Sequence, residues 1–275
     1  MSTGNLYIVS TPIGNLEDIT FRAIKTLKEV DVIAVEDTRH SLKLLNHYGI
    51  SKPLISYWSE KEKVRSEAII ERLMSGLSVA LITDAGTPGI SDPGAVIIKK
   101  AIDKGIKVIP IPGPSAFIAA LSVSGLSTEE FIFIGFLPNK KAQRQKKLRE
   151  LALQERTIIF YEAPHRILET LSDIEEILGD RKSVLTKEIT KLHEEVFRGN
   201  ISEIIHALKK RTIAGEYVLI VEGKKKESIS LEEALDEVWS LMKRGKGRKE
   251  AVKIVAEGYG ISKKELYDKS LDGKK

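Results

Sequence analysis

Short runs of β-branched and aliphatic residues alternate with longer amphipathic stretches over most of the chain. Strands that alternate with helices of about 10 to 15 residues are typical of βαβ units, whose strands form a mostly parallel sheet. We therefore predict an α/β fold. In the first series, the predicted strands are 6–10, 31–35, 54–57, 79–83 and 107–109, and the predicted helices are 18–29, one that ends at 48, 60–75 and 93–104.

The same alternation starts again after Ile-Pro-Gly-Pro at 111–114, which is punctuated like a crossover between two such units. The predicted strands of the second series are 131–134, 157–161, 183–188 and 216–221, and its predicted helices are 115–124, 140–154 and 164–178. A charged linker follows at 224–228. We therefore predict an N-terminal α/β domain, 1–112, and a C-terminal α/β domain, 113–226.

Beyond the linker only helical periodicity remains, with predicted helices at 231–243, 248–258 and 262–271. Ser262 and Glu265 have the spacing of a capping box for the last helix. Two helices joined by the short Gly-containing turn at 259–261 are typical of a helix-turn-helix, and an ordinary packed helical pair fits the pattern equally well. We treat 227–275 as a small helical tail.

Composition narrows the class of protein. The chain has 275 residues, 42% of them hydrophobic, which suits two packed domains, and its formal net charge of +5 permits an anionic partner. Cysteine is absent, which excludes disulfides, thiolate–zinc sites, iron–sulfur clusters and cysteine nucleophiles. The sequence has neither a basic-then-apolar leader nor an apolar stretch near the roughly 20 residues that span a bilayer. We therefore expect a cytoplasmic protein that makes no membrane contact.

Ligands of open α/β sheets bind in the crevice beyond the carboxyl ends of the strands. Four predicted loops lie there: T-P-I-G-N at 11–15, E-D-T-R at 36–39, T-D-A-G-T-P-G-I-S-D-P-G at 83–94 and P-G-P-S at 112–115. The third loop has three glycines, two prolines and two aspartates in 12 residues, more special residues than a structural turn needs. Its Asp84 can accept hydrogen bonds from ligand hydroxyls or from an ammonium group. We therefore predict a small-molecule site at 83–94.

Two common nucleotide motifs are not supported. Gly89 and Gly94 have the spacing of a phosphate loop, but Ala95 and Val96 stand where its Lys and Ser/Thr would be, so neither the terminal phosphates nor Mg²⁺ would be held. No G-x-G-x-x-G motif follows a predicted strand. The five histidines show no H-x-H or H-x-x-x-H pairing, and we expect no metal site.

Two later segments also follow strands. In Y-E-A-P-H-R at 161–166, Glu162, His165 and Arg166 would lie beside the same crevice, and a helix cap with exposed charges explains them equally well. The segment K-E-I-T-K-L-H-E-E-V-F-R-G at 187–199 is dense in acidic and basic groups, a pattern more typical of a solvated face than of a site.

Basic residues form three clusters, at 140–149, 224–226 and 243–249. One such cluster is usually a solvated helical face, but several together, one of them in the tail, favour a partner with a phosphate backbone. The candidate RNA-binding residues are Lys140, Lys141, Arg144, Lys146, Lys147, Lys246, Arg248 and Lys249.

The ordered set of motifs carries a family resemblance. The segments 6–20 (L-Y-I-V-S-T-P-I-G-N-L-E-D-I-T), 35–39 (V-E-D-T-R), 83–94, P-G-P-S-A at 112–116, G-F-L-P at 135–138 and Y-E-A-P-H-R resemble the tetrapyrrole-methylase-like superfamily of S-adenosylmethionine enzymes, and within it the bacterial enzymes that methylate a ribose 2′-hydroxyl of 16S rRNA. The resemblance extends over nearly the whole chain. It implies two α/β domains with the methyl donor in the cleft between them, a homodimer, and methylation of a decoding-centre cytidine in 16S rRNA of the small ribosomal subunit.

The resemblance also implies roles for residues. The candidate donor-binding residues are Asp84, Ala85, Gly86, Thr87, Pro88, Ser115, Ala116, Glu162 and Ala163, together with Pro12 and Gly14. Pro12 and Gly14 replace a glycine-rich first loop, which leaves that loop to bind either donor or RNA. The candidate catalytic residues are Asp37 as base or orienting group, Arg39 as an anchor for phosphate or for Asp37, and Glu162, Lys187 and Glu188 in reserve.

The chemistry agrees with these residues, because a ribose hydroxyl needs its proton removed or its oxygen polarised before it attacks a methyl group. Two other functions stay open on the same fold. One is a tetrapyrrole C-methyltransferase, which would need neither the basic clusters nor the tail, and the other is a non-catalytic RNA-binding assembly factor.

Overall fold

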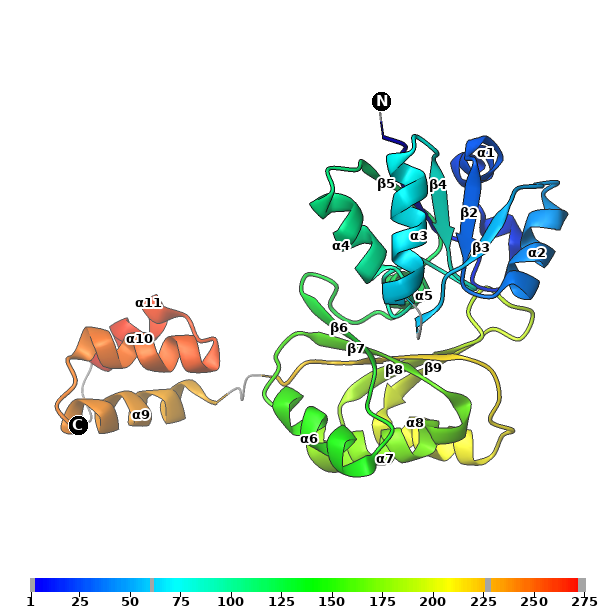
Figure 1. The fold of residues 1–275 in the computed structure, drawn as a ribbon. Helices are drawn as coiled ribbons and strands as arrows, with labels where there is room; N and C mark the ends of the chain where they lie inside the picture. The colour runs from blue at the N-terminus through cyan, green and yellow to red at the C-terminus, as the bar shows by residue number, and fades with distance from the viewer. Residues whose placement is uncertain (1–2, 60–61, 226–228, 272–275) are drawn as a thin grey trace. The chain divides into compact units, whose positions relative to one another are not determined.

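The computed structural model describes residues 3–59, 62–225 and 229–271, and the chain forms two structural units (Figure 1). The first unit comprises Met1–Ala152 and Arg156–Glu222, and the second comprises Leu153–Glu155 and Gly223–Lys275. The first unit contains two five-stranded sheets, and the second contains three helices. The domain boundaries at 112 and 226 stay predictions, and residue 226 lies outside the described residues.

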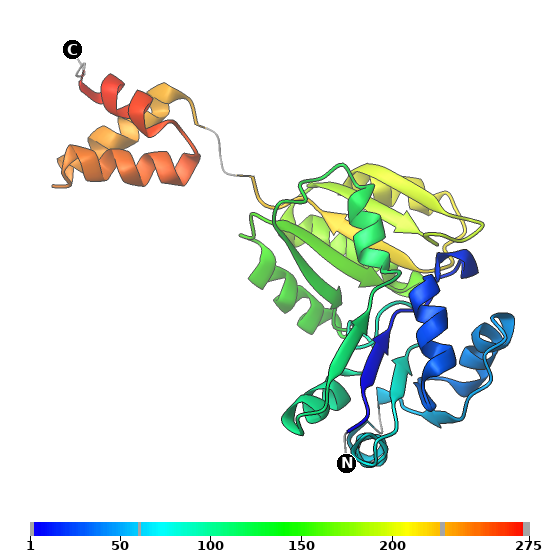
Figure 2. The same cartoon turned by 90° about the horizontal axis from the view of Figure 1, so that it is seen from above.

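The first sheet is parallel throughout, as the alternating pattern predicts. Its strands are β1 (Leu6–Val9), β2 (Val32–Val35), β3 (Leu54–Ser56), β4 (Val79–Ile82) and β5 (Val108–Ile111), in the spatial order β3-β2-β4-β1-β5. The helices are α1 (Phe21–Glu29) and α2 (Thr38–His47) on one face and α3 (Glu62–Met74) and α4 (Ala95–Asp103) on the other (Figure 2). Because both faces are covered, β2 and β4 are buried along their whole length, which explains their unbroken apolar sequences.

The second sheet is mixed, and the expectation of a mostly parallel sheet is wrong here. Its strands are β6 (Phe131–Phe136), β7 (Thr157–Glu162), β8 (Lys182–Lys187), β9 (Glu195–Asn200) and β10 (Tyr217–Val221), in the order β6-β7-β10-β8-β9. Only the β6–β7 pair is parallel. The segment after β8 turns back as β9, and β10 runs antiparallel to both of its neighbours, β7 and β8. The many charged residues of β9 gave no indication of a strand. A helix that the sequence analysis missed, α8 (Ile201–Lys209), then leads to β10.

Helices cover both faces of this second sheet as well. They are α5 (Ala116–Ser122) on one face and α6 (Lys141–Leu151), α7 (Ile167–Leu178) and α8 on the other, where Figure 1 shows them on the side away from the first sheet. A short 3₁₀ turn, Pro164–Arg166, precedes α7. The α5 face therefore lies toward the first sheet, at the carboxyl ends of its strands.

The second unit consists of α9 (Leu231–Lys243), α10 (Arg248–Tyr259) and α11 (Lys263–Leu271), close to the predicted helices. The helices bury a core of their own that includes Val238, Val255 and Leu266. Ser230 and Glu233 form a complete capping box at α9, whereas at α11 only the Glu265 N–H donates to Ser262 Oγ, at 3.3 Å. Within the described parts of both units, no helix is long and apolar enough to cross a membrane.

Candidate functional site

A cavity of about 480 Å³ lies between the carboxyl ends of the first sheet's strands and the second sheet. Small-molecule sites commonly have this size. The loops of the first sheet, which form the first half of the unit, contribute Ile13, Glu36, 84–87 and 90–92. The second half, which consists of the second sheet and its helices, contributes Ser115, Ala116, Phe136, 161–164, Thr186, Ile189 and 216–218.

The loop 83–94 joins the other three predicted loops. It meets the first loop through two backbone hydrogen bonds between Thr11 and Gly86, of 2.8 and 3.1 Å. The Thr87 hydroxyl lies 2.8 Å from Oγ of Ser10, which directly precedes the first loop, and donates to the carbonyl of Pro114 in the fourth at 3.4 Å. These contacts follow from the strand order, because β1 lies between β4 and β5. The structure therefore brings together loops that are far apart in the sequence.

The predicted donor-binding residues lie mostly on the cavity. Those that line it are Asp84, Ala85, Gly86, Thr87, Ser115, Ala116, Glu162 and Ala163, whereas Pro12, Gly14 and Pro88 do not. The first loop contributes Ile13 instead, and Gly14 lies against the side chain of Lys191 in the second half. Gly14 has a φ of +151°, and a Cβ at this position would lie 2.3 Å from Lys191 Cγ, so a larger residue would displace the lysine.

Asp37 and Arg39 do not line the cavity. The Asp37 carboxylate caps α2, accepting from the backbone N–H groups of Arg39 at 2.7 Å and His40 at 3.3 Å. These two donors lower its pKa. The Arg39 side chain is 94% exposed and lies 3.9 Å from Asp37. The backbone N–H of Asp37 donates to Asp84 at 3.3 Å, so Asp37 ties the second loop to the third.

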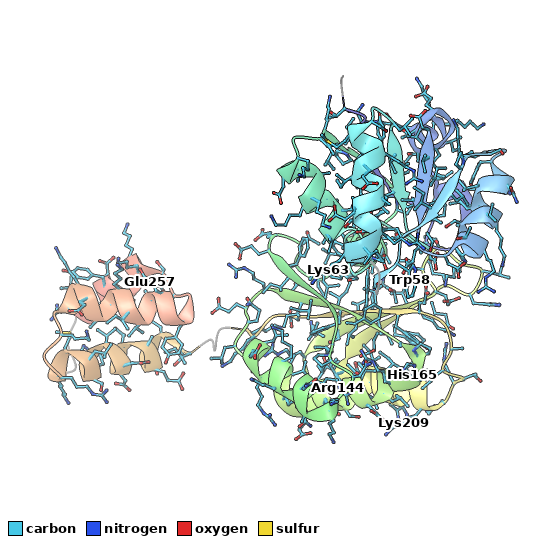
Figure 3. All side chains as sticks on the ribbon, viewed as in Figure 1. Trp58, Lys63, Arg144, His165, Lys209 and Glu257 are labelled. Carbon is cyan, nitrogen blue, oxygen red and sulfur yellow. The ribbon has the colours of Figure 1, made fainter. Side chains whose placement is uncertain are left out.

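Glu162 lines the cavity, but its carboxylate is fully buried and fully engaged. It accepts from the guanidinium of Arg166, from the Thr170 hydroxyl at 2.6 Å and from the backbone N–H of Ala163 at 2.8 Å. Arg166 in turn donates to the carbonyl of Leu137 at 2.8 Å. Glu162 and Arg166 of Y-E-A-P-H-R thus form a buried ion pair. His165 of the same segment is exposed and does not line the cavity (Figure 3).

Lys187 and Glu188 lie beside the cavity rather than in its lining. Lys187 Nζ is 3.2 Å from Glu195 on β9. Glu188 accepts from Lys191 Nζ at 2.8 Å and from the backbone N–H of Glu216 at 2.9 Å. Lys191 Nζ also lies 3.0 Å from Glu216, which does line the cavity. The carboxylates of this second half therefore have cationic partners.

The first half contributes Glu36, Asp84 and Asp92, which we call the acidic wall. The side chain of Glu36 accepts from the Asp84 N–H at 3.4 Å. Burial, followed by the neighbouring carboxylates of Glu36, Asp84 and Glu216, raises the pKa of Asp92 to about 7. Burial likewise raises the pKa of Glu36, and the charges of Asp84 and Asp37 add to it. The cavity lining contains no Lys, Arg or His among the described residues.

Glu36 and Asp92 were not among the predicted site residues, although each lies inside a recognisable motif, E-D-T-R and 83–94 respectively. Thr186, Ile189 and 216–218 were not predicted either, and of these only Ile189 lies in a segment singled out from the sequence, 187–199. The antiparallel pairing of β10 with β7 and β8 brings 216–218 to the cavity.

The basic residues have different environments. Lys140, at the N-cap of α6, and Lys141 and Lys146 on that helix are exposed, and Lys147 pairs with Glu150 at 3.1 Å. The expectation that Arg144 contacts RNA is corrected: its side chain is 2% exposed, and its Nε donates to Asp173 at 2.6 Å (Figure 3). In the tail, Lys249 is exposed, Arg248 is half-buried and Lys246 pairs with Glu250 at 2.5 Å, while Lys226 of the 224–226 cluster lies outside the described residues. In the part of the chain that the structure describes, no group of three or more His, Asp or Glu side chains is placed to hold a metal ion.

Comparison with known sequences identifies relatives over almost the whole chain. Residues 5–205 match the family model described as Tetrapyrrole (Corrin/Porphyrin) Methylases. The chain is 47% identical to "Ribosomal RNA small subunit methyltransferase I" of Halalkalibacterium halodurans, with 96% of this chain and 94% of the relative covered. It is 48% identical to the protein of that name from Bacillus subtilis, with 96% and 93% covered. The Thermotoga maritima protein of that name is 49% identical over 221 residues, which are 80% of this chain and 99% of the relative.

Solved structures share the fold. The methyltransferase CobJ has a TM-score of 0.61 and 17% identity, with 83% of this chain and 98% of that chain covered. Uroporphyrin-III C-methyltransferase from Thermus thermophilus, complexed with S-adenyl homocysteine, has a TM-score of 0.57 and 18% identity, with 80% and 97% covered. At these identities the likeness extends to the fold alone.

Proposed function

Because this chain belongs to the tetrapyrrole methylase family and, within it, to the ribosomal RNA small subunit methyltransferase I proteins, we propose that it transfers a methyl group from S-adenosylmethionine to the ribose 2′-hydroxyl of a cytidine in the decoding centre of 16S rRNA. The chain is a methyltransferase by family, and the donor, the atom methylated and the nucleotide are our proposal. We further propose that it acts as a homodimer and, because ribosomal subunits are its substrate, in the cytoplasm.

The observation that carries this proposal is the acidic wall of the cavity. The donor bears a positive sulfonium and an ammonium group, and Glu36, Asp84 and Asp92 offer negative charge without a basic residue in the described lining. Gly86 has a φ of +76°, so the backbone turns at the cavity without a side chain that would block a ligand. Apolar side chains such as Ile13 and Val218 also line the cavity. The residues present therefore fit such a donor.

We assign donor binding to the predicted residues that line the cavity, 84–87, Ser115, Ala116 and 162–163. When bound, the donor supplies an activated methyl group, and the protein has to align the acceptor oxygen with that carbon and remove the hydroxyl proton. The acidic wall favours a cationic donor over the neutral thioether that remains after transfer, which supports exchange of product for fresh donor.

For the RNA partner, exposed Lys140, Lys141 and Lys146 on α6 and Lys249 in the tail offer positive charge. Contacts of this kind bind phosphates without reading sequence, so affinity for RNA should fall steeply as salt rises. Arg144 is excluded from this group, because its charge is neutralised inside the protein by Asp173.

The direct test is transfer of a labelled methyl group to isolated small ribosomal subunits from cells that lack this modification, with the product nucleotide mapped. We expect one methylated ribose, on a cytidine of the decoding centre. Methylation of a base, or of a tetrapyrrole in place of the subunit, would contradict the proposal. Calorimetry with S-adenosylmethionine separates the remaining alternative, since a non-catalytic assembly factor would show no donor binding.

Removal of residues 223–275 tests the role of the tail. The Thermotoga maritima relative is about as long as the first unit, which supports independent folding of that unit. We expect the shortened protein to bind the donor as the full chain does and to methylate subunits less efficiently, mainly through a higher KM. Equal activity on subunits would remove the tail from substrate recognition.

A further inference from the structure

Phe136, the last residue of β6, is a large apolar side chain left open to the cavity. It lines the cavity and is 55% exposed, whereas Ile13 and Val218 of the same lining are buried. A single exposed apolar residue is common on protein surfaces and by itself indicates nothing. The backbone around Phe136 is what distinguishes it from an ordinary exposed residue.

A β-bulge in β6 turns Phe136 toward the cavity. Between Phe133 and Gly135 the register with β7 shifts, so that β6 carries one residue more than its partner strand. Side chains alternate between the two faces of a strand, and Phe133 and Phe136, three positions apart, would otherwise lie on opposite faces. With the extra residue they share one face, where the Tyr161 ring lies 5.0 Å from Phe133 and 5.6 Å from Phe136 between centroids. Bulges that re-aim a side chain in this way are common beside active sites.

The bulge brings the two walls of the cavity together at Gly135. This residue has a φ of +73°, in the left-handed region that favours glycine, and a Cβ there would lie 2.9 Å from Ser91 Oγ on the loop 83–94. Ile90, the neighbour of Ser91, is a second exposed apolar residue of the lining. Phe136 and Ile90 therefore flank the same close approach, one on each wall. An aromatic ring and an aliphatic side chain on opposite walls are suited to binding a flat group between them.

Other aromatic rings support Phe136 from behind. Phe117 of α5 stacks on Phe133, with ring centroids 4.3 Å apart and an interplanar angle of 18°. Phe133 meets Tyr161 edge-on, and the Tyr161 hydroxyl accepts from the backbone N–H of Phe117 at 3.3 Å. Tyr161 is thus fixed by α5 and β6, and it carries Phe136 as the outermost ring of the row. A ring supported in this way presents a rigid apolar surface to a ligand at a small cost in conformational entropy.

We propose that Phe136 stacks on the base of the nucleotide whose ribose is methylated and so positions that ribose for transfer. This inference rests on the proposed function. A ribose that reaches a methyl donor inside a cavity brings its base with it, and that base loses its stacking partners in the RNA. The ring of Phe136 replaces the lost stacking. Because every base has a flat face, this contact binds a nucleobase without reading its identity.

The donor also carries a flat base, adenine, and the position of Phe136 favours the acceptor. The residues that we assign to the donor lie on other segments of the lining. Phe136 is followed four positions later by Lys140, at the start of α6, and four residues span at most about 14 Å. Lys140 and Lys141 are exposed and offer positive charge to RNA phosphates. RNA bound to these lysines is therefore near enough to Phe136 to place one nucleotide in the cavity.

The experiment compares methylation of small ribosomal subunits by the wild type, Phe136→Ala, Phe136→Leu and Phe136→Tyr. The matched control is Phe131→Ala, since Phe131 is an exposed phenylalanine of the same strand that lies outside the lining. We expect Phe136→Ala to lower kcat/KM for subunits by roughly 5- to 150-fold, mainly through KM, while donor Kd by calorimetry stays within about twofold. Phe136→Tyr should be close to the wild type, whereas Phe136→Leu should not recover the loss, because it keeps the apolar volume without a flat face. Thermal unfolding and sedimentation check that each variant folds and associates like the wild type.

Four results would overturn the inference. A kcat/KM for Phe136→Ala within about twofold of the wild type would remove Phe136 from acceptor recognition. A rise in donor Kd that accounts for the whole loss would assign the ring to the donor's adenine instead. Full activity of Phe136→Leu would show an apolar contact without stacking, and a changed oligomeric state of Phe136→Ala would make this residue a contact between copies of the chain. If the wild type binds the donor but methylates no ribose, the proposed function and this inference both fail, whereas a fully active Phe136→Ala variant refutes this inference alone.

Discussion

The two walls of the cavity hold their carboxylates in opposite electrostatic settings. On the acidic wall, burial and neighbouring carboxylates raise the pKa values of Glu36 and Asp92, and the described lining has no basic residue. On the wall from the second sheet, Glu162 is paired with Arg166, and Glu216 with Lys191. Both walls are acidic in sequence, and only the structure distinguishes them.

The difference separates carboxylates that build the protein from those that can respond to a ligand. A buried carboxylate with a guanidinium and two further donors has nothing to gain from a cationic ligand, because its charge is already compensated. Unpaired carboxylates near one another repel, and a cation entering between them relieves that repulsion. On the proposed function, the acidic wall therefore lowers folding stability and favours ligand binding.

The largest predicted effect tests the paired wall. Glu162→Gln leaves the guanidinium of Arg166 buried without a counter-charge, and we expect it to reduce the free energy of unfolding by about 3–5 kcal/mol. Denaturation in urea measures this change. The double variant with Arg166→Met should recover much of the loss, because neither charge is then left alone. A loss below about 1 kcal/mol for the single variant would show that the pair is not structural.

The next prediction tests the acidic wall through its pH dependence. The pKa of Asp92 is raised from 3.8 to about 7 in the folded protein, so the folded state holds this proton more tightly than the unfolded state. Its contribution to stability is therefore fully present below about pH 4 and is lost as the pH rises through 7. Asp92→Asn should leave stability at pH 4 unchanged and increase it at pH 8, by about 1–2 kcal/mol once solvent screening is allowed for.

Thermal unfolding of wild type and Asp92→Asn across this pH range gives the measurement, with Asp103→Asn as the control. If the two aspartate variants respond alike, Asp92 does not carry the repulsion of the acidic wall. Opposite effects of Asp92→Asn on stability and on methyl transfer would sharpen the comparison of the two walls, since Glu162→Gln should lower both.

Local patterns predicted the first half and the tail well. Hydrophobic periodicity and turn residues are local signals that can be read from the sequence. They predict the five parallel strands, the loops at the carboxyl ends of these strands and the three C-terminal helices. The loop 83–94 carries its own signal, because three glycines in it take positive φ values that other residues disfavour.

Features that depend on contacts between distant segments could not be predicted. Strand β9 has the charged sequence of a solvated face, and the antiparallel pairs that it forms with β8, and β10 with β7 and β8, make the second sheet mixed. Arg144 lies in a basic run, yet its side chain is buried, where it donates to Asp173, 29 positions away in the sequence. Asp37 and Asp92 each lie in a recognisable motif, and the sequence does not distinguish the aspartate that caps a helix from the one whose carboxylate has no partner among the described residues.

The smallest predicted effect concerns that last distinction. Asp37 contributes to stability as the N-cap of α2, so Asp37→Ala should lower Tm by about 2–4 °C, and Asp37→Asn by less, because asparagine also caps helices well. The pKa of Asp37 is lowered, so this contribution is present above its unfolded pKa and disappears as the pH falls through its folded pKa. The Tm difference from the wild type should therefore vanish in acid for Asp37→Asn, as it should for Asp92→Asn. As the pH rises the two differences take opposite signs, because Asp37→Asn becomes less stable than the wild type and Asp92→Asn more stable. The same direction of pH dependence for both variants would contradict the assignment of Asp37 as a cap and Asp92 as the unpaired carboxylate of the cavity.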